Sequence, residues 1–476
     1  MLLGLDLGTT NVKAVLTRRN GGVVARASAP VRLYHTPDGG TEQDIDEIWA
    51  ATRSAIGECV AAAEASEPVE AVGVSSQGGA LQVLDQHGRP QGRVISWLDT
   101  RGRPYDEALN DELGREWFIA HVGHAGSRLA IGQIERLRHE RALPAEARIA
   151  FVGDMIVGRL CEHAAHDATS LSLGMLYNPS QHRADPDLLA RLQLDEAHLP
   201  ALFSPRAAAG RLTGSVARDT GLPAGIPVSP AVHDQYAAAL GANVTHAGDV
   251  MVGTGTAWVL LLVSPTLEPP IANRSFVCTH LVEKLYGQIL SMYTGGSALS
   301  WSLELTGQDN CSGDALDALF ESVPAGCDGM RVQPHFVTPV RANLANAGYI
   351  SGVRLQHGKA HLVRAVLEGL ACELARYLDF ARAANVPVHG LVLCGAAARS
   401  RVTPQIIADV TDLPVTCLVE HDTSAFGAAI LARGLLELDA PLQAIAADMQ
   451  AGTRTVAPGP QHDLYTALLE EYLDAT

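Results

Sequence analysis

The chain has 476 residues, and 35 lysines and arginines against 52 aspartates and glutamates give it a formal net charge of −17. Apolar residues make up 47% of the sequence and charged residues 18%, a globular composition that excludes a disordered, collagen-like or coiled-coil chain. The acidic balance argues against binding to nucleic acid or to an anionic membrane, because both depend on basic patches. The eight cysteines are widely spaced without a C-x-x-C pair, and no signal peptide or membrane-length apolar stretch is found. These features predict a cytoplasmic enzyme with reduced thiols.

The first predicted elements are three short strands joined by tight turns. Residues 2–7 are apolar, residues 12–16 alternate, and residues 23–25 resume the strand pattern after a second turn. A helix is predicted over residues 44–65 from its apolar stripe, and a strand over residues 70–75 follows it. The order is strand, turn, strand, helix and strand.

The second half of the chain repeats this order. Residues 249–260 resemble the opening strand, glycine–threonine turn and strand, a long helix is predicted over residues 359–384, and a strand over residues 391–394 follows. Such patterns also recur by chance, but the shared order favours a duplicated α/β unit with its ligand in the cleft between the copies. The Pro/Gly-rich stretch at 221–228 places the boundary near Gly241.

The turn from Asp6 to Lys13 is the first candidate phosphate site. Glycine lets the backbone approach a phosphate closely, and Thr9 and Thr10 add amide and hydroxyl donors. An aspartate at a strand end, such as Asp6, can hold Mg²⁺ through water, and Lys13 adds a positive charge. The sequence does not match a Walker P-loop, and on its own the segment is equally consistent with a plain hairpin.

Two turns in the second half are candidates for the rest of a nucleotide. Gly253-Thr254-Gly255-Thr256 stands at the matching place in the repeat, and its pairing with the first turn favours a phosphate clamp over a structural turn. Gly395-Ala396-Ala397-Ala398-Arg399 joins a strand to a helix, and its small residues allow adenosine to lie against the backbone. A tight connection without a ligand is the alternative for this second turn.

Asp234 is the candidate general base. It follows the strand-like residues 228–232 and precedes a run of small residues. A carboxylate at a strand end is well placed to accept a proton from a hydroxyl. Capping of the helix that follows is an equally good interpretation of this aspartate from the segment alone.

The order of these motifs resembles that of the FGGY family of carbohydrate kinases, within the ribonuclease H-like, actin-like ATPase fold. The resemblance covers nearly the whole chain. Two runs, 405–410 and 424–429, are similar to xylulokinase members of the family in particular. The other motifs that carry the resemblance are 4–14, the W-x-D-x-R segment Trp97-Leu98-Asp99-Thr100-Arg101, 153–170, Asp234 and 253–256.

The resemblance implies an α/β chain of two ribonuclease H-like domains with a cleft between them: residues 1–243 bind sugar and residues 244–476 bind nucleotide. It implies ATP and Mg²⁺ as cofactors, a small sugar or polyol as acceptor, Asp234 as catalytic base, and allows a homodimer. The implied ATP and phosphate residues are Thr9, Thr10, Asn11, Lys13, Gly253, Thr254, Gly395, Ala396 and Arg399. The implied substrate residues are Gln77, Gly78, Asp99, Arg101, Asp234 and Gln235, and the implied metal ligands are Asp6 and Asp234.

The sequence departs from the family pattern at three places: the first two leave the acceptor open, and the third concerns nucleotide affinity. Gln77-Gly78-Gly79-Ala80 stands where xylulokinases usually read Gln-Met-His-Gly, and Gln235 follows Asp234 as in glycerol kinases. Ala396 and Ala397 stand where the adenosine loop normally has glycine, at a cost of about 1 kcal/mol if either needs a positive φ.

A pentulose such as D-xylulose is the expected acceptor, with glycerol, a tetritol or another ketose as the alternatives. A degenerate regulatory homologue and an actin-like or heat-shock-like ATPase are further alternatives. The segment from Trp97 to Arg101 and Asp234 favour a kinase over such an ATPase, which needs neither of them to hydrolyse ATP.

Overall fold

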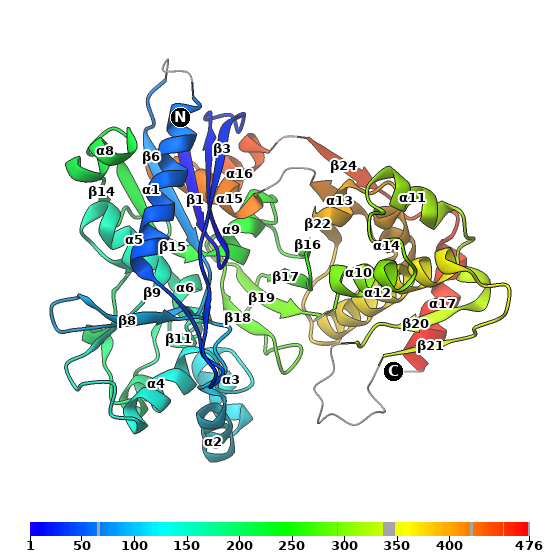
Figure 1. Cartoon of the computed structure of the whole chain (residues 1–476), viewed down its shortest axis with the longest axis horizontal. Helices are drawn as coiled ribbons and strands as arrows, with labels where there is room; N and C mark the ends of the chain where they lie inside the picture. The colour runs from blue at the N-terminus through cyan, green and yellow to red at the C-terminus, as the bar shows by residue number, and fades with distance from the viewer. Residues whose placement is uncertain (64–66, 293, 337–347, 419–421, 451, 475–476) are drawn as a thin grey trace. The chain divides into compact units, whose positions relative to one another are not determined.

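The computed structural model describes residues 1–63, 67–292, 294–336, 348–418, 422–450 and 452–474 (Figure 1). The chain forms two compact units. The first unit comprises Met1–Thr245, Pro265–Gln288 and Asp422–Ala451, and the second comprises His246–Ser264, Ile289–His421 and Gly452–Thr476. The units are therefore not two continuous halves of the chain, since a late segment packs with the N-terminal residues.

The first unit is built on a mixed sheet in the order β13-β10-β15-β6-β1-β2-β3, with β14 paired to β15. Strands β1, β6 and β15 run parallel, whereas β2 and β3 continue the sheet as antiparallel neighbours. Because parallel strands share a direction, the carboxyl ends of β1, β6 and β15 meet at one edge. The strands are β1 (Leu2–Leu7), β2 (Asn11–Thr17), β3 (Val23–Pro30), β6 (Ala71–Ser76), β10 (Ala165–His166), β13 (Ala201–Leu202), β14 (Gly210–Arg211) and β15 (Pro227–His233).

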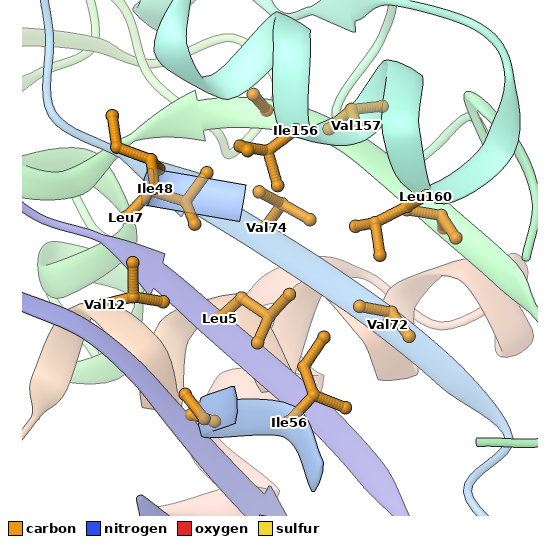
Figure 2. Close-up of a cluster of buried hydrophobic side chains, with 14 of the residues drawn as sticks. Leu5, Leu7, Val12, Ile48, Ile56, Val72, Val74, Ile156, Val157 and Leu160 are labelled. Carbon is orange, nitrogen blue, oxygen red and sulfur yellow. The ribbon is translucent and has the colours of Figure 1, made fainter. Parts of the chain in front are cut away.

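Helices α1 (Ile45–Ala61) and α5 (Val152–Cys161) bury the apolar side chains of one face of this sheet (Figure 2). Alternate residues of a strand point to the same face, so Leu5 of β1 and Val74 of β6 enter the same cluster as Ile48 and Ile156 of the helices. Each such buried aliphatic side chain contributes about 1.5–3 kcal/mol relative to its exposed state. This cluster holds β1 and β6 at fixed register.

Helix α15 (Thr423–Leu436) covers the other face at backbone contact distance (Figure 1). A Cβ atom added to Gly4 of β1 would lie 1.8 Å from the carbonyl oxygen of Ala425, and one added to Gly73 of β6 would lie 1.8 Å from that of Ala428. Helix α9 (Asp234–Gly241) packs equally close to α15, since a Cβ added to Gly427 of α15 would lie 1.8 Å from the carbonyl oxygen of Ala237 in α9. Glycine at these places lets a helix from late in the chain complete the first unit.

A second sheet of the first unit has the order β4-β5-β8-β7-β9. Its strands are β4 (Tyr34–His35), β5 (Thr41–Gln43), β7 (Leu81–Leu84), β8 (Pro90–Ile95) and β9 (Arg148–Phe151). The remaining elements of the unit are α2 (Arg103–Leu113), α3 (Arg115–Val122), α4 (Ala130–His139), α6 (Ala168–Leu173), β11 (Tyr177–Asn178), β12 (Arg183–Ala184), α7 (Pro186–Arg191), the 3₁₀ turn Glu196–His198, α8 (Gly214–Thr220), β18 (Phe276–Thr279) and α16 (Leu442–Met449).

The second unit has a sheet with the strand order β17-β16-β22-β23-β24, in which β16, β22 and β23 run parallel. The long helix α12 packs with α14 and α17 beside it. Strand β19 (Tyr286–Ser291) begins in a segment of the first unit, which ends at Gln288, and continues into a segment of the second, which begins at Ile289. The other elements are β16 (Asp249–Thr254), β17 (Trp258–Ser264), α10 (Gly296–Leu305), α11 (Asp314–Glu321), the 3₁₀ turn Cys327–Gly329, β20 (Arg331–Gln333), β21 (Tyr349–Ser351), α12 (Lys359–Ala383), β22 (Gly390–Gly395), α13 (Ala396–Arg399), α14 (Thr403–Thr411), β23 (Val415–Leu418), β24 (Thr453–Val456) and α17 (His462–Asp474).

The predicted strands and helices are confirmed with shifted ends. The helix predicted over residues 44–65 is α1, which begins at Ile45 because the Asp44 carboxylate accepts hydrogen bonds from the backbone N–H groups of Asp46 and Glu47. It ends at Ala61, and residues 64 and 65 lie outside the described residues. The repeat strands are β16 and β17, and the predicted long helix is α12. No helix in the described part of the chain is both long and apolar enough to cross a bilayer.

Candidate active site

Sheet register brings several polar residues, predicted ones and their neighbours, to the carboxyl edge of the first sheet. Asp6 on β1 lies opposite Lys13 on β2 and opposite Ser75 on β6. One residue further on, His233 closes β15 opposite Ser76, and Asp234 begins α9. Ligands of open α/β sheets bind at such edges, where chain segments leave the strands.

The Asp6 carboxylate accepts a hydrogen bond from the Ser75 hydroxyl at 2.9 Å. Burial, as the largest influence, and the charge of Asp234 raise the pKa of this group to about 7. The Ser75 hydrogen bond and the Lys13 charge act in the opposite direction without offsetting burial. Asp6 is therefore a carboxylate whose negative charge is poorly compensated by the protein itself.

Asp234 occupies the first turn of α9, and 27% of its side-chain surface stays exposed. Burial raises its pKa to about 7, against the influence of the Gln235 backbone N–H. His233 occupies the cap position of α9, so Asp234 is not the N-cap that one interpretation of the sequence allowed. A carboxylate that is partly exposed and titrates near neutral pH has the properties of a general base.

The two carboxylates suit a magnesium ion. Mg²⁺ is commonly held by one or two protein carboxylates and keeps several waters and phosphate oxygens as its other ligands. The pair Asp6 and Asp234 offers only oxygen donors, and the charge of Asp234 raises the pKa of Asp6. In the described residues no cluster of three or more His, Cys, Asp or Glu side chains has metal-binding geometry.

Thr9 and Gln77 contact each other in a buried hydrogen-bond network. The Thr9 hydroxyl donates to Gln77 Oε1 at 3.0 Å, and the Trp97 indole N–H donates to the Thr9 oxygen at 2.9 Å. Gln77 Nε2 donates to Gln43 Oε1 at 3.0 Å, and Gln43 Nε2 donates to the Thr9 carbonyl at 3.0 Å. Both ends of the Gln77 amide are thus used within the protein, while the Trp97 side chain is 45% exposed.

The other residues of the first phosphate motif lie around the turn between β1 and β2. Asn11 Nδ2 donates to the Thr10 hydroxyl at 3.1 Å, and Thr10 is exposed. Lys13 Nζ lies 2.7 Å from the carboxylate of Asp422, the residue before α15. Burial acts to lower the pKa of Lys13, but the Asp422 contact outweighs it and raises that pKa, so the ammonium remains charged.

Asp99 and Arg101 form a buried ion pair. Arg101 Nη2 lies 2.6 Å from Asp99, whose side chain is fully buried, and the same guanidinium contacts Glu42 at 2.7 Å. Asp99 also accepts hydrogen bonds from the Thr41 backbone N–H at 3.0 Å and from Gln133 Nε2 at 3.0 Å. Burial alone would raise the pKa of Asp99, but the Arg101 contacts hold it below its usual range. The pair fixes the loop that carries Trp97.

Gly78 lies against the His233 ring. A Cβ atom added to Gly78 would lie 2.6 Å from His233 Cδ2 and 2.6 Å from Leu173 Cβ. The predicted substrate residues Gly78, Asp234 and Gln235 therefore lie near one another around His233. Gln235 follows Asp234 in the first turn of α9.

The predicted nucleotide residues of the second unit are brought together by the pairing of β16 with β22. Thr254 lies opposite Gly395, its hydroxyl donates to the Cys394 carbonyl at 2.6 Å, and it accepts from the Ala397 N–H at 3.1 Å. Gly253 belongs to the same strand, and Ala396 and Arg399 are the first and last residues of α13.

Within the strand-to-helix turn, Gly395 has a φ of 92°, whereas Ala396 and Ala397 do not take positive φ. The conformational cost considered for alanine at these two positions therefore does not arise.

Four residues of this region were not singled out as individual site residues from the sequence: Gln43, Trp97, His233 and Asp422. Both Trp97 and His233 carried a signal, because Trp97 opens the W-x-D-x-R segment and His233 lies beside Asp234. Gln43 and Asp422 carry no local signal, since their roles come from contacts with residues 34 and 409 positions away in the chain.

The fold and this set of residues define a class: an α/β phosphotransferase with paired carboxylates and glycine–threonine turns at strand ends. The model of the FGGY family of carbohydrate kinases, N-terminal domain, matches residues 1–241, and that of the C-terminal domain matches residues 250–433. The chain therefore belongs to the FGGY family of carbohydrate kinases, whose solved members share the two-domain actin-like ATPase fold.

Several relatives align with this chain over most of their length. A xylulose kinase of Staphylococcus epidermidis is 26% identical over 440 residues, covering 91% of this chain and 87% of that protein. A glycerol kinase of Koribacter versatilis is 28% identical over 452 residues, covering 90% and 89%. The crystal structure of xylulose kinase from Rhodospirillum rubrum superimposes with a TM-score of 0.88 at 28% identity and covers 99% of this chain and 97% of that one.

Proposed function

We propose that this protein transfers the γ-phosphoryl group of ATP to a hydroxyl group of a small ketose or polyol in the cytoplasm. A pentulose such as D-xylulose is the preferred acceptor, because relatives named xylulose kinase match along nearly the whole chain. The observation that carries the proposal is the Asp234 carboxylate, partly exposed at the end of β15, with its pKa raised to about 7 beside Asp6.

In the proposed reaction, Asp234 accepts the proton of the acceptor hydroxyl as that oxygen attacks the γ-phosphorus in line. The bond from phosphorus to the bridging oxygen breaks, and ADP leaves with the electron pair. Positioning and charge stabilisation supply most of the catalysis in such a transfer. Asp6 and Asp234 would hold Mg²⁺, which when bound neutralises phosphate charge. Lys13 and the backbone N–H groups around Thr9 and Thr10 would orient the phosphates.

Trp97 is proposed as the apolar wall for the carbon skeleton of the acceptor. Its ring is exposed although its N–H is held by Thr9, so the orientation of the ring is fixed and its face stays available. The proposal retains Gln235 as an acceptor contact. In this proposal Gln77 and Asp99 act indirectly: Gln77 positions Thr9 through a hydrogen bond, and Asp99 positions Arg101 through an ion pair.

Glycerol or another small polyol is the second candidate acceptor. Its support is Gln235, together with the alignment to a glycerol kinase over 90% of this chain. A non-catalytic regulatory role has lost its one supporting observation, since the alanines after Gly395 cause no backbone strain.

The test is ADP release by the purified protein with ATP and Mg²⁺, measured across pentuloses, hexuloses, tetritols, glycerol and no acceptor. We expect release to depend on acceptor and to be greatest with a pentulose. Release that is equal with and without acceptor would contradict the kinase proposal, and the greatest rate with glycerol would replace the acceptor. Asp234→Asn should lower kcat by about 100-fold or more, the contribution of a general base, while residual transfer stays measurable and calorimetry shows unchanged ATP binding.

A further inference from the structure

His233 occupies the space that a side chain at position 78 would fill. A Cβ on Gly78 would lie 2.6 Å from His233 Cδ2 and 2.8 Å from His233 Nε2, distances that real Cβ atoms do not show. Gly78 has no positive φ, so its lack of a side chain is required by close contacts and not by the backbone: an added Cβ would meet the His233 ring and also, at 2.6 Å, Leu173 Cβ. The imidazole is therefore fitted against Gly78.

The backbone of His233 is held as firmly as its ring. Its N–H donates to the Thr169 hydroxyl at 2.9 Å, and that hydroxyl donates to Asp167 Oδ1 at 2.7 Å. Asp167 is buried and caps α6 by accepting from the Ser170 N–H at 3.0 Å. Only 7% of the His233 side-chain surface is exposed, and the Tyr236 ring meets it edge-on. The ring has one available position.

In that position His233 Nε2 lies 3.2 Å from Asp234 Oδ1. Among the described residues, His233 is the one side chain recorded within hydrogen-bonding or ion-pair distance of this carboxylate. When Asp234 is ionised, as it must be to act as a base, it only accepts hydrogen bonds, so the contact is then favourable with the imidazole proton on Nε2. The proton cannot then satisfy Nδ1, which is buried and has no partner in the described part of the chain.

Packing alone does not account for an imidazole at this place. A buried polar atom without a partner is destabilising, and an apolar side chain of similar size would fill the same space without one. What an apolar side chain would not supply is a nitrogen beside Asp234.

We propose that His233 is a positioning residue: its imidazole, fitted into the space left by Gly78, holds the Asp234 carboxylate in the orientation in which it accepts the proton of the acceptor hydroxyl. This inference rests on the proposed role of Asp234 as the base. It makes Gly78, just after the end of β6, and His233, at the end of the neighbouring strand β15, a matched pair in which the small residue makes room for the large one.

The test compares His233→Leu, which fills the space without a nitrogen, with His233→Gln, whose Nε2 can reach the same carboxylate. With ATP and the best acceptor, His233→Leu should lower kcat by about 10- to 100-fold, because small misplacements of a catalytic group have effects of this size. The KM for acceptor and the ATP dissociation constant should change little. His233→Gln should recover most of the lost kcat. The proposal would be overturned if both variants lost the same kcat and if that loss were proportional to their loss of thermal stability.

A double-mutant cycle with Asp234→Asn separates positioning from folding. If His233 acts through Asp234, adding His233→Leu to Asp234→Asn should not lower kcat further. A further loss equal to that of the single variant would overturn the proposal. No acceptor-dependent turnover by the unmodified protein would overturn both this inference and the proposed function, whereas loss in Asp234→Asn with full kcat in His233→Leu would overturn this inference alone.

Gly78→Ala approaches the same pair from the other side. The added methyl group should displace the His233 ring and lower kcat in the manner of His233→Leu. Gly57→Ala in α1 is the matched control, because a Cβ at Gly57 meets no atom within 4 Å and should leave kcat unchanged. Full kcat in a folded Gly78→Ala variant would contradict the pairing.

Discussion

The ammonium group of Lys13 lies 2.7 Å from the carboxylate of Asp422, and so the first phosphate motif is joined to the start of α15, a helix that begins more than 400 residues later. Asp422 has a φ of 65°, a left-handed conformation at the end of a strand-to-helix connection. Side-chain surface remains exposed on both partners, 39% for Lys13 and 21% for Asp422. The lysine is therefore held in place and still able to contact an anion.

Substitution of the two partners should have different consequences. Because exposed pairs contribute little, Asp422→Asn should change the free energy of unfolding by less than about 1 kcal/mol. Lys13→Met should lower kcat/KM for ATP by about tenfold or more, the value of a charge-assisted hydrogen bond. Urea unfolding and steady-state kinetics at varied ATP measure the two effects. Equal kinetic losses in both variants would show that the ion pair, and not the lysine charge, is what matters.

The raised pKa values of Asp6 and Asp234 predict an acidic limb in the rate profile. Burial raises both pKa values to about 7, so the base is lost as the pH falls through that value. At low Mg²⁺ the value of kcat/KM for acceptor should fall below about pH 7, and saturating Mg²⁺ should move the limb to lower pH, because a cation favours the ionised carboxylates. A limb near pH 4 that does not respond to Mg²⁺ would contradict both assignments.

The same shifts predict how stability depends on pH. A carboxyl group whose pKa is higher in the folded than in the unfolded state binds its proton more tightly when folded. The contribution of Asp6 and Asp234 to stability is then fully present below about pH 4 and is lost as the pH rises through about 7. In the metal-free protein, Asp6→Asn should therefore weaken the fall in unfolding free energy between pH 5.5 and 7.5.

Substitution of Trp97 should lower kcat/KM for the acceptor and leave ATP binding unchanged. Its exposed ring is held by the hydrogen bond to Thr9, and an aromatic face of this kind removes apolar area of a bound sugar from water. Trp97→Ala should lower kcat/KM for acceptor by about tenfold or more, corresponding to about 1.4 kcal/mol. The neighbouring Leu98, with 39% of its surface exposed, provides the control Leu98→Ala. Comparable losses in the two variants would assign the effect to the loop as a whole.

Substitution of Asp99 should lower the free energy of unfolding more than it changes the kinetics. Its carboxylate is fully buried and neutralises Arg101, so Asp99→Ala leaves a guanidinium with Glu42 as its close partner. Removal of one partner of a buried ion pair typically costs about 3–5 kcal/mol. Urea unfolding should show a loss of this order, with a smaller change in the KM for acceptor at a temperature where the variant is folded. A large rise in KM without loss of stability would instead show that Asp99 contacts the sugar directly.

The sequence determined those features that depend on residues close together in the chain. Short runs of apolar residues located β1, β6 and β15, in which nearly every residue is buried, and apolar periodicity located α12. The positions of Asp6 and Asp234 at strand ends followed from the same pattern, and their raised pKa values agree with a role for each carboxylate. The similarity in motif order along the chain indicated the family, which the match to residues 1–241 and 250–433 establishes.

Only the tertiary structure decided which polar atoms meet. The pairing of β1, β6 and β15 brings together the turns that follow these strands, so that Thr9 contacts Gln77 and His233 lies against Gly78. Neither contact has a local signal, because strands adjacent in the sheet are distant in the chain. The packing of α15 on Gly4 brings Asp422 to Lys13 for the same reason. A residue's type and neighbours in sequence therefore identified the chemistry available to this protein. The backbone approach of distant segments, set by buried apolar surface and by the lack of side chains at a few glycines, decided how that chemistry is arranged.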